Sequence, residues 1–168
     1  MSKIKAHVAI SLDGYIAHTD GEINWIPREL AKEISEIHQS SETLLAGSNT
    51  YNAIFEQCGS WPHKNSYIVS HYDGSALAKE GLQYLFDEPI EKICEMKKAA
   101  TRDIMVIGGG NLITSLLNNQ LLDELNLYIV PVLLGYGIRF LGKTYDVSVK
   151  STKPEDYKGT TKITYIFN

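Results

Sequence analysis

Val106-Ile107-Gly108-Gly109-Gly110-Asn111-Leu112-Ile113 is the stretch that decides the fold of this chain. Apolar residues give way to three glycines and then to a helical pattern, which predicts a buried strand that turns into a helix. Glycines let the backbone approach a ligand closely, and the free N–H groups of a helix's first turn attract an anion. The turn therefore predicts a phosphate site, although a strand-to-helix turn also favours glycine for structural reasons alone.

Strand-like and helix-like segments alternate around this turn. The patterns predict strands over Ile4–Ile10, Thr43–Ala46, Ser66–Val69, Leu82–Phe86, Ile104–Ile107 and Leu125–Val130. They predict helices from Pro27 to about His38, from Ser48 through Phe55, from Asp87 to about Ala100 and after Gly110. Turn residues predict loops over Ser11–Gly21 and Pro131–Gly137.

The C-terminal part has a different pattern, with apolar and polar residues alternating at period two. It predicts two antiparallel strands, Tyr145–Lys150 and Lys162–Phe167, joined around Lys153-Pro154-Glu155-Asp156. The fold class expected is α/β, with a mixed, mostly parallel sheet flanked by helices on both faces and a C-terminal antiparallel hairpin at its edge. Ligands of such a sheet bind beyond the carboxyl ends of its strands.

The composition excludes several function classes. A chain of 168 residues with 43% hydrophobic and 21% charged residues predicts one domain, residues 1–168. The net charge of −4 disfavours nucleic acid and anionic membranes as partners. Cys58 and Cys94 have no metal-ligand spacing, nor do the five histidines, so no metal is expected. The N-terminus leads directly into a strand, and no stretch reaches membrane-spanning length, which indicates a cytoplasmic protein.

The glycine turn does not fit a Rossmann dinucleotide motif. Ile113 stands where a third small residue belongs, the turn comes late in the chain, and no suitable acidic residue follows about 20 residues later. We therefore reject that interpretation.

Several separated motifs together resemble one family. In order they are Ser11-Leu12-Asp13-Gly14-Tyr15-Ile16-Ala17, Gly47-Ser48-Asn49-Thr50-Tyr51, Ile68-Val69-Ser70, Gly108-Gly109-Gly110-Asn111-Leu112, Asp123-Glu124-Leu125 and Pro131-Val132-Leu133-Leu134-Gly135-Tyr136-Gly137. Their order and spacing resemble the dihydrofolate-reductase-like superfamily. Within it they resemble the branch that contains the reductase domain of bifunctional riboflavin-biosynthesis proteins (RibD C-terminal domain-like). The resemblance covers nearly the whole chain and implies a dihydrofolate-reductase-like three-layer fold.

The resemblance implies an NADPH site spread over several strand ends. It places Ala9, Ile16 and Ala17 beside the nicotinamide half and Gly108, Gly109, Gly110, Asn111 and Leu112 at the pyrophosphate. It places Gly47, Ser48, Thr50 and Ser70 on the adenylate side. Related reductases commonly carry a basic residue at the position of Ser48, where it binds the 2′-phosphate, so NADH is possible as well. Lys64, His71 or Lys79 could supply the positive charge instead, and the sequence does not choose among them.

Three residues are candidates for the substrate side of the site. Hydride transfer needs a proton source when a substrate nitrogen is protonated, and the resemblance suggests Asp13 and Glu29 as catalytic acids. Asp13 can equally cap a turn before Gly14, and Glu29 can simply favour the start of a helix. Trp25 either covers the nicotinamide as part of the substrate pocket or packs at the helix entry.

The resemblance therefore implies an NAD(P)H-dependent oxidoreductase that transfers a hydride to a small heterocyclic substrate, pyrimidine- or pterin-like. The alternative is a catalytically inactive nucleotide-binding module that acts as a sensor or partner protein. The branch also implies a homodimer, with apolar residues between Val130 and Leu141 as a modest indication. The physiological substrate is left open.

Overall fold

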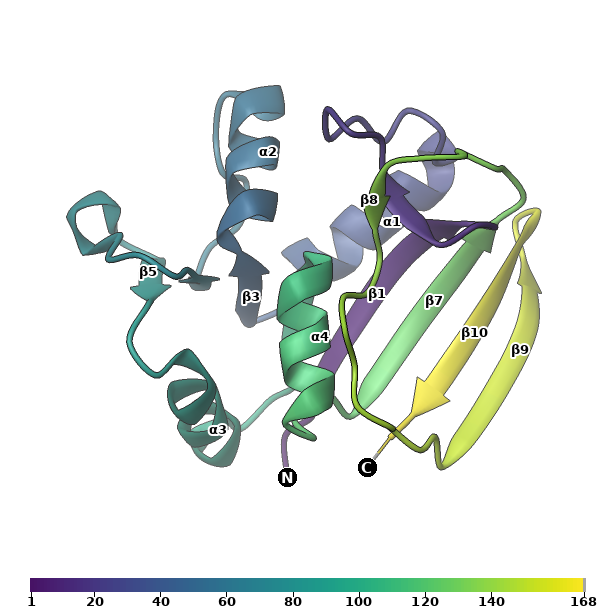
Figure 1. The fold of residues 1–168 in the computed structure, drawn as a ribbon. Coiled ribbons are helices and arrows are strands. Elements are labelled where there is room, and N and C mark those ends of the chain that lie inside the picture. Colours follow the sequence, from purple (N-terminus) through teal and green to yellow (C-terminus); the bar gives the residue numbers. More distant parts are fainter. Residues whose placement is uncertain (168) are drawn as a thin grey trace.

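A computed structural model describes residues 1–167, and its main feature is an eight-stranded sheet with the order β5-β4-β3-β6-β1-β7-β10-β9 (Figure 1). A second sheet consists of β2 and β8. The strands are β1 Ile4–Ser11, β2 Tyr15–Ala17, β3 Thr43–Gly47, β4 Ser66–Val69, β5 Leu82–Leu85, β6 Ile104–Gly108, β7 Glu124–Val130, β8 Ile138–Arg139, β9 Ser151–Tyr157 and β10 Thr160–Ile166. The helices are α1 Arg28–Gln39, α2 Ser48–Cys58, α3 Pro89–Ala99 and α4 Gly110–Asn118, with a 3-10 turn η1 at Ser75–Leu77.

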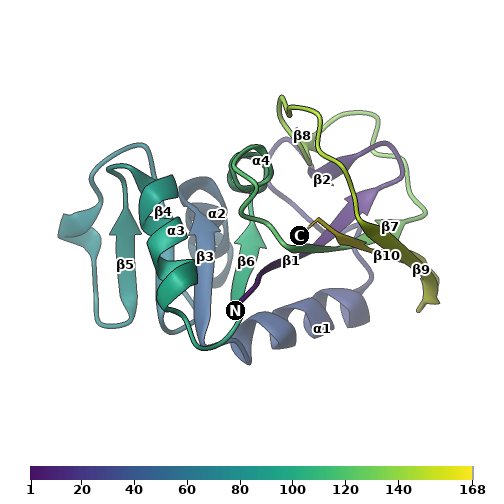
Figure 2. The same ribbon diagram turned by 90° about the horizontal axis from the view of Figure 1, so that it is seen from below.

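The centre of the sheet is built from parallel strands that are buried on both faces. β1 pairs in parallel with β6 on one side and with β7 on the other. Ile4, Ala6 and Val106 are fully buried there, which accounts for their continuous apolar sequences. Figure 2 shows α1 on one side of this central region and α4 on the opposite side. The predicted α/β architecture with a mostly parallel sheet between helices is therefore confirmed.

The C-terminal hairpin exists, but its predicted register was wrong. β9 covers Ser151–Tyr157 and pairs antiparallel with β10, so the predicted strand over residues 145–150 and the predicted turn over residues 153–156 do not occur. The turn is instead Lys158-Gly159, where positive φ values of 53° and 75° match a two-residue type I′ hairpin. Pro154 is accepted within β9 because β9 is an edge strand.

The two segments expected to be loops pair with one another. β2 follows the turn after β1, and β8 follows the segment after β7, and they form the two-stranded antiparallel sheet. Gly137 makes this approach possible, since a Cβ there would collide with the carbonyl oxygen of Ala17. Turn residues signalled the breaks after β1 and β7, but three- and two-residue strands have no periodicity that a sequence could show.

Candidate cofactor site

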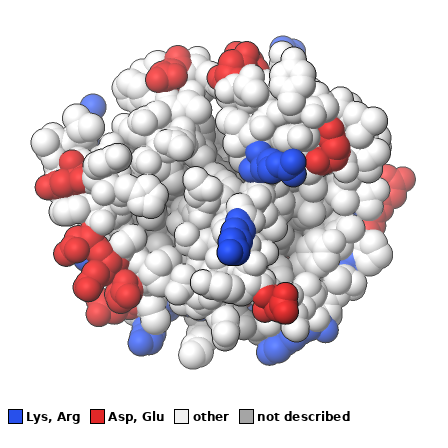
Figure 3. Space-filling model, in the orientation of Figure 1, with Lys and Arg blue, Asp and Glu red and all other residues white. Residues whose placement is uncertain are grey.

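The candidate site lies at the carboxyl ends of the parallel strands, where β3, β4 and β6 end side by side. Ala46 pairs with Ile68 on one flank and with Gly108 on the other, so Gly47, Ser70 and the glycine turn lie at one edge of the sheet. In the sequence, more than 20 positions separate Gly47 from Ser70, and more than 20 separate Ser70 from the glycine turn. Figure 3 shows, in the orientation of Figure 1, that the surface is hollowed between the α2 region and the β8 region, with Lys or Arg side chains beside the hollow.

The turn after β6 leaves no room for a side chain at Gly109. A Cβ on Gly109 would lie 2.7 Å from Oγ1 of Thr50, and a Cβ on Gly47 would lie 3.5 Å from the backbone N of Gly109. Gly108 has a φ of +114°, a conformation that L residues rarely adopt, and the Gly108–Gly109 peptide bond is cis. Backbone from two strand ends and the Thr50 hydroxyl therefore come together in one small area.

Two helices begin at this point, and neither carries an acidic residue in its first turn. α2 begins after Gly47 and α4 begins after Gly109, both without a side-chain cap. In contrast, α1 has Glu29 and α3 has Glu91 in the first turn. The first-turn N–H groups and the helix dipole of α2 and α4 are therefore not offset by carboxylates and favour an external anion.

The remaining predicted residues of the phosphate side differ in exposure. Asn111 is exposed, whereas Leu112 is 5% exposed and packs in the core beneath the turn. Ser48, Thr50 and Ser70 are half-buried and supply hydroxyl groups along the strand ends. The backbone and the donor set therefore fit a phosphate-containing cofactor.

Asp13 lies in the turn between β1 and β2, and all of its described hydrogen bonds are structural. Its Oδ1 accepts hydrogen bonds from the Ser11 hydroxyl (2.6 Å) and from the N–H of Leu134 (3.1 Å). Its Oδ2 accepts one from the N–H of Gly135 (2.7 Å). These donors, the Ser11 hydroxyl first, lower the pKa of Asp13 from 3.8 to about 2. The carboxylate stays ionised at neutral pH and holds the segment after β7 against the turn.

That segment, residues 131–142, connects the two sides of the candidate site. The N–H of Leu12 donates to the carbonyl of Val132, and the N–H of Phe140 donates to the carbonyl of Gly14. At its other end, the N–H of Gly142 donates to Oγ1 of Thr114 on α4 (3.0 Å). The sequence analysis missed this connection, because the partners lie more than 100 residues apart or on different elements.

The predicted nicotinamide residues lie on β1 and on β2, where Ala17 pairs with Ile138 of the 131–142 segment. Ala9 and Ala17 are each 7% exposed, and Ile16 is half-buried. Trp25 packs in a cluster that includes Ala9 and the buried Tyr128. Its indole Nε1 is buried and has no hydrogen-bond partner among the described residues. A donor without an acceptor beside the predicted nicotinamide site is available to a bound molecule.

Glu29 does not join Asp13. It is exposed in the first turn of α1, close enough to Lys158 on the far hairpin that the two charges interact. His7 lies beneath α1 instead, with Nδ1 3.0 Å from the hydroxyl of Tyr128. Burial lowers the pKa of His7 from 6.5 to about 4 and raises the pKa of Tyr128 from 10.0 to about 12. Both side chains are therefore neutral at pH 7.

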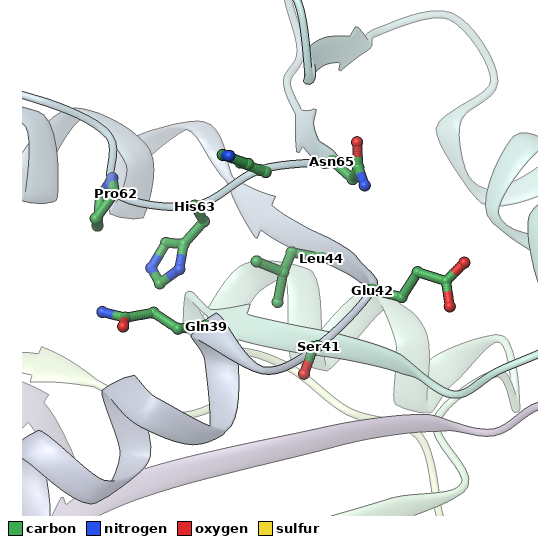
Figure 4. Close-up of a pocket in the computed structure, with 8 residues that line it drawn as sticks. Gln39, Ser41, Glu42, Leu44, Pro62, His63 and Asn65 are labelled. Carbon is green, nitrogen blue, oxygen red and sulfur yellow. The ribbon is translucent and has the colours of Figure 1, made fainter.

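A separate hollow of about 300 Å³ lies at the opposite ends of β3 and β4, away from the glycine turn (Figure 4). Its lining is mainly polar and includes Gln39, Ser41, Glu42, His63 and Asn65. None of the predicted cofactor residues lines it, so the candidate site rests on the strand ends rather than on this hollow. No group of three or more His, Cys, Asp or Glu side chains suited to a metal ion occurs within residues 1–167. No helix in the same range is long and apolar enough to cross a membrane.

Comparison with solved structures identifies the class of fold. The structure of dihydrofolate reductase from Enterococcus faecalis, complexed with NADP(H) and RAB-propyl, has a TM-score of 0.74 and 17% identity over 99% of this chain and 96% of that one. A putative riboflavin biosynthesis protein from Shewanella sp. PV-4 has a TM-score of 0.81 and 22% identity over 99% of both chains. The chain has the dihydrofolate-reductase-like fold.

The sequence comparisons indicate the branch within that class. Residues 87–162 match the family model of the RibD C-terminal domain. The uncharacterized proteins YyaP and YwjB of Bacillus subtilis (strain 168) are both 26% identical, YyaP over 99% of this chain and 95% of its own, YwjB over 81% and 80%. Riboflavin biosynthesis protein RibD of Corynebacterium ammoniagenes is 26% identical over 79% of this chain and 44% of that protein. The expected resemblance to the riboflavin-reductase branch of the superfamily is confirmed.

Proposed function

We propose that the chain is an NAD(P)H-dependent reductase that transfers a hydride to a small heterocyclic substrate, pyrimidine- or pterin-like. The observation that carries the proposal is the convergence of α2 and α4 at Gly47 and Gly109, two helix starts without an acidic residue. Two such starts at the strand ends suit the phosphates of a dinucleotide. The structural likeness to a reductase complexed with NADP(H) supports the same cofactor class.

In this reaction the dihydronicotinamide supplies a hydride to an electrophilic carbon of a C=N bond, the nitrogen takes a proton, and the cofactor is left oxidised. The protein has to bind the cofactor, orient the substrate and exclude water. We propose that Ala9, Ile16 and Ala17 border the nicotinamide. Trp25 would then cover the substrate side, where its unpartnered indole N–H can donate to a ring acceptor.

The hydrogen bonds of Asp13 support a positioning role for this residue. With its pKa lowered to about 2 and three donors on its carboxylate, Asp13 has no proton to give at neutral pH. We propose that it positions the 131–142 segment, while a direct catalytic part for Asp13 or Glu29 stays a prediction. Tyr128 belongs to the same cluster as Trp25, and we propose that its hydroxyl, 3.0 Å from Nδ1 of His7, helps to orient the groups around the substrate.

Because Asp13 is ionised at neutral pH, one alternative is a nucleotide-binding module that has no turnover and acts as a sensor or partner protein. One assay distinguishes the two functions. NADPH oxidation is followed at a fixed enzyme concentration with dihydrofolate and with a phosphoribosylamino-pyrimidine as substrates, alongside binding of the cofactor alone. Binding with substrate-dependent oxidation supports the reductase, whereas saturable binding without turnover on any heterocycle supports the binding module.

We also propose a homodimer. Val130 and Phe140 are buried within the chain, but between them Leu133 and Tyr136 are 71% and 70% exposed, and Ile138 is 44% exposed. Large apolar side chains gathered on one segment mark an interaction surface more often than isolated ones do. Light scattering tests this: a mass of twice 18.8 kDa supports the dimer, and a mass of 18.8 kDa contradicts it.

A further inference from the structure

Arg139 on β8 is a positive charge held in place without a carboxylate partner. It is the register partner of Tyr15 on β2, and its guanidinium carbon lies 5.6 Å from the centroid of the Tyr15 ring. None of the ion pairs formed within residues 1–167 includes Arg139, although Lys5, Lys97, Arg102, Lys158 and Lys162 all have acidic partners. Stacking on an aromatic ring orients a guanidinium while leaving its N–H donors available.

The backbone of Arg139 touches the first residue of α4. A Cβ on Gly110 would lie 3.0 Å from the carbonyl oxygen of Arg139 and would collide with the carbonyl oxygen of Phe140. Gly110 thus lets β8 lie directly against the start of this helix. Tyr15, the register partner of Arg139, is followed by Ile16 and Ala17, the residues proposed to border the nicotinamide. Arg139 consequently lies between the proposed nicotinamide side and the proposed pyrophosphate side of the site.

We propose that Arg139 binds the pyrophosphate of the cofactor at the phosphate that carries the nicotinamide ribose. This inference rests on the proposed function and adds to it a residue that the sequence analysis did not identify. The arginine adds a positive charge to the N–H groups of α4, and a guanidinium can donate to two phosphate oxygens at once. The basic residue absent at Ser48 would recognise the 2′-phosphate, whereas Arg139 recognises a group that NADPH and NADH share.

The test compares the binding of three ligands by three variants, of which two each lose one positive charge and one keeps it. Arg139→Gln removes the cation at the site, and Arg102→Gln removes an exposed arginine that pairs with Glu42 at the amino ends of β3 and β6, opposite the strand ends that form the candidate site. Arg139→Lys retains the charge but not the fork of donors. Each purified variant is titrated with NADPH, NADH and dihydronicotinamide riboside, which has no phosphate. The thermal midpoint without ligand is measured alongside, to show that each variant is folded.

The proposal predicts that Arg139→Gln weakens NADPH and NADH binding by the same factor, roughly tenfold to a hundredfold, as expected for the loss of a charge-assisted hydrogen bond. Binding of the riboside stays unchanged, Arg139→Lys recovers part of the loss, and Arg102→Gln binds like the parent protein. Unchanged NADPH affinity in a folded Arg139→Gln protein, or an equal loss for the riboside, would overturn the proposal while leaving the proposed function standing. Failure of the parent protein to bind any of the three ligands would contradict the proposed function itself.

Discussion

Oγ1 of Thr50 lies 2.7 Å from the point at which a Cβ on Gly109 would stand, so the start of α2 occupies the space that a side chain on the glycine turn would need. Gly109 itself has a φ of −88° and a ψ of −178°, which any residue can adopt. The requirement for glycine here is therefore one of space rather than of backbone conformation. This relationship joins the two helix starts into one site.

Replacement of Gly109 by Val is expected to abolish cofactor binding, because a branched side chain would fill the space between the glycine turn and the start of α2 and displace Thr50. Affinity for NADPH should fall by about a hundredfold or more on the basis of the lost phosphate contacts. The matched control is Gly142→Ala, where a Cβ would make only ordinary contacts of 3.7 to 3.9 Å with Thr114 and Asn111. Isothermal titration calorimetry on both variants checks this, and retained affinity in Gly109→Val would refute the placement.

Asp13→Asn tests whether this residue positions the 131–142 segment or donates a proton. As an anion, Asp13 accepts from Ser11, Leu134 and Gly135, so the amide should loosen the segment and raise the KM for the cofactor. Since the pKa of Asp13 is lowered to about 2, Asp13 is ionised throughout the range from pH 5 to 8, and the alkaline limb of the kcat pH profile should keep its position in the variant. A variant that loses that alkaline limb while keeping the parental KM would instead show that Asp13 is the proton donor.

Acid pH should destabilise the protein through its buried histidines. Burial lowers the pKa of His38 from 6.5 to about 3, and its electrostatic coupling to His7 on β1 and His63 before β4 acts in the same direction. Between those two pH values the unfolded chain binds a proton at this residue and the folded chain does not. The free energy of unfolding therefore falls as pH drops, by roughly 1.4 kcal/mol per pH unit for one such group.

The variant His38→Leu should flatten this dependence, because it removes a buried imidazole whose Nε2 has no partner among the described residues. His71→Leu, at an exposed position, serves as the control and should retain the parental slope. Urea denaturation at pH 7 and pH 5 gives the comparison. If the free energy of unfolding changed equally between pH 7 and pH 5 in His38→Leu and in the parent protein, His38 would not be buried in its neutral form.

Asp123 should be one of the most sensitive positions for folding. It is 7% exposed, accepts a hydrogen bond from the N–H of Ile4 (2.7 Å) and pairs with Lys97 (2.7 Å). Asp123→Ala would leave the largely buried ammonium without its carboxylate partner, which typically costs about 3 kcal/mol or more. Chemical denaturation measures the effect, with Glu155→Ala on the exposed hairpin as the control. A change below about 1 kcal/mol, the usual value of an exposed pair, would contradict this assignment.

The parts of the fold that were predictable from sequence are those set by local pattern. The apolar run before Gly108 and the glycines that follow it specify a buried strand and a tight turn within eight residues, and the structure has both. The C-terminal hairpin shows the limit of prediction from local pattern. Its turn was predicted at the turn-like residues around Pro154, whereas the structure has the turn at Lys158-Gly159. The side-chain period is two, so a misplaced turn shifts every pairing along both strands.

The candidate site was predictable only where its residues act through local geometry. Strands β3 and β6 are parallel neighbours, so their carboxyl ends lie side by side at the same edge of the sheet. This pairing brings Gly47, Thr50 and Gly109 together. The partners of Asp13 could not be predicted, since Leu134 and Gly135 contact it through backbone N–H groups that every residue carries. The same holds for Arg139, whose position follows from a two-residue strand pairing with β2.

The central claim is that the strand ends around Gly109 bind a nicotinamide dinucleotide. It is tested most directly by titrating the protein with NADPH and with NADH while following the fluorescence of Trp25 and Trp61 and the thermal midpoint. The account predicts saturable binding, with a midpoint that rises with ligand concentration in the parent protein and stays constant in Gly109→Val. A parent protein whose fluorescence and midpoint do not respond to either dinucleotide would contradict it.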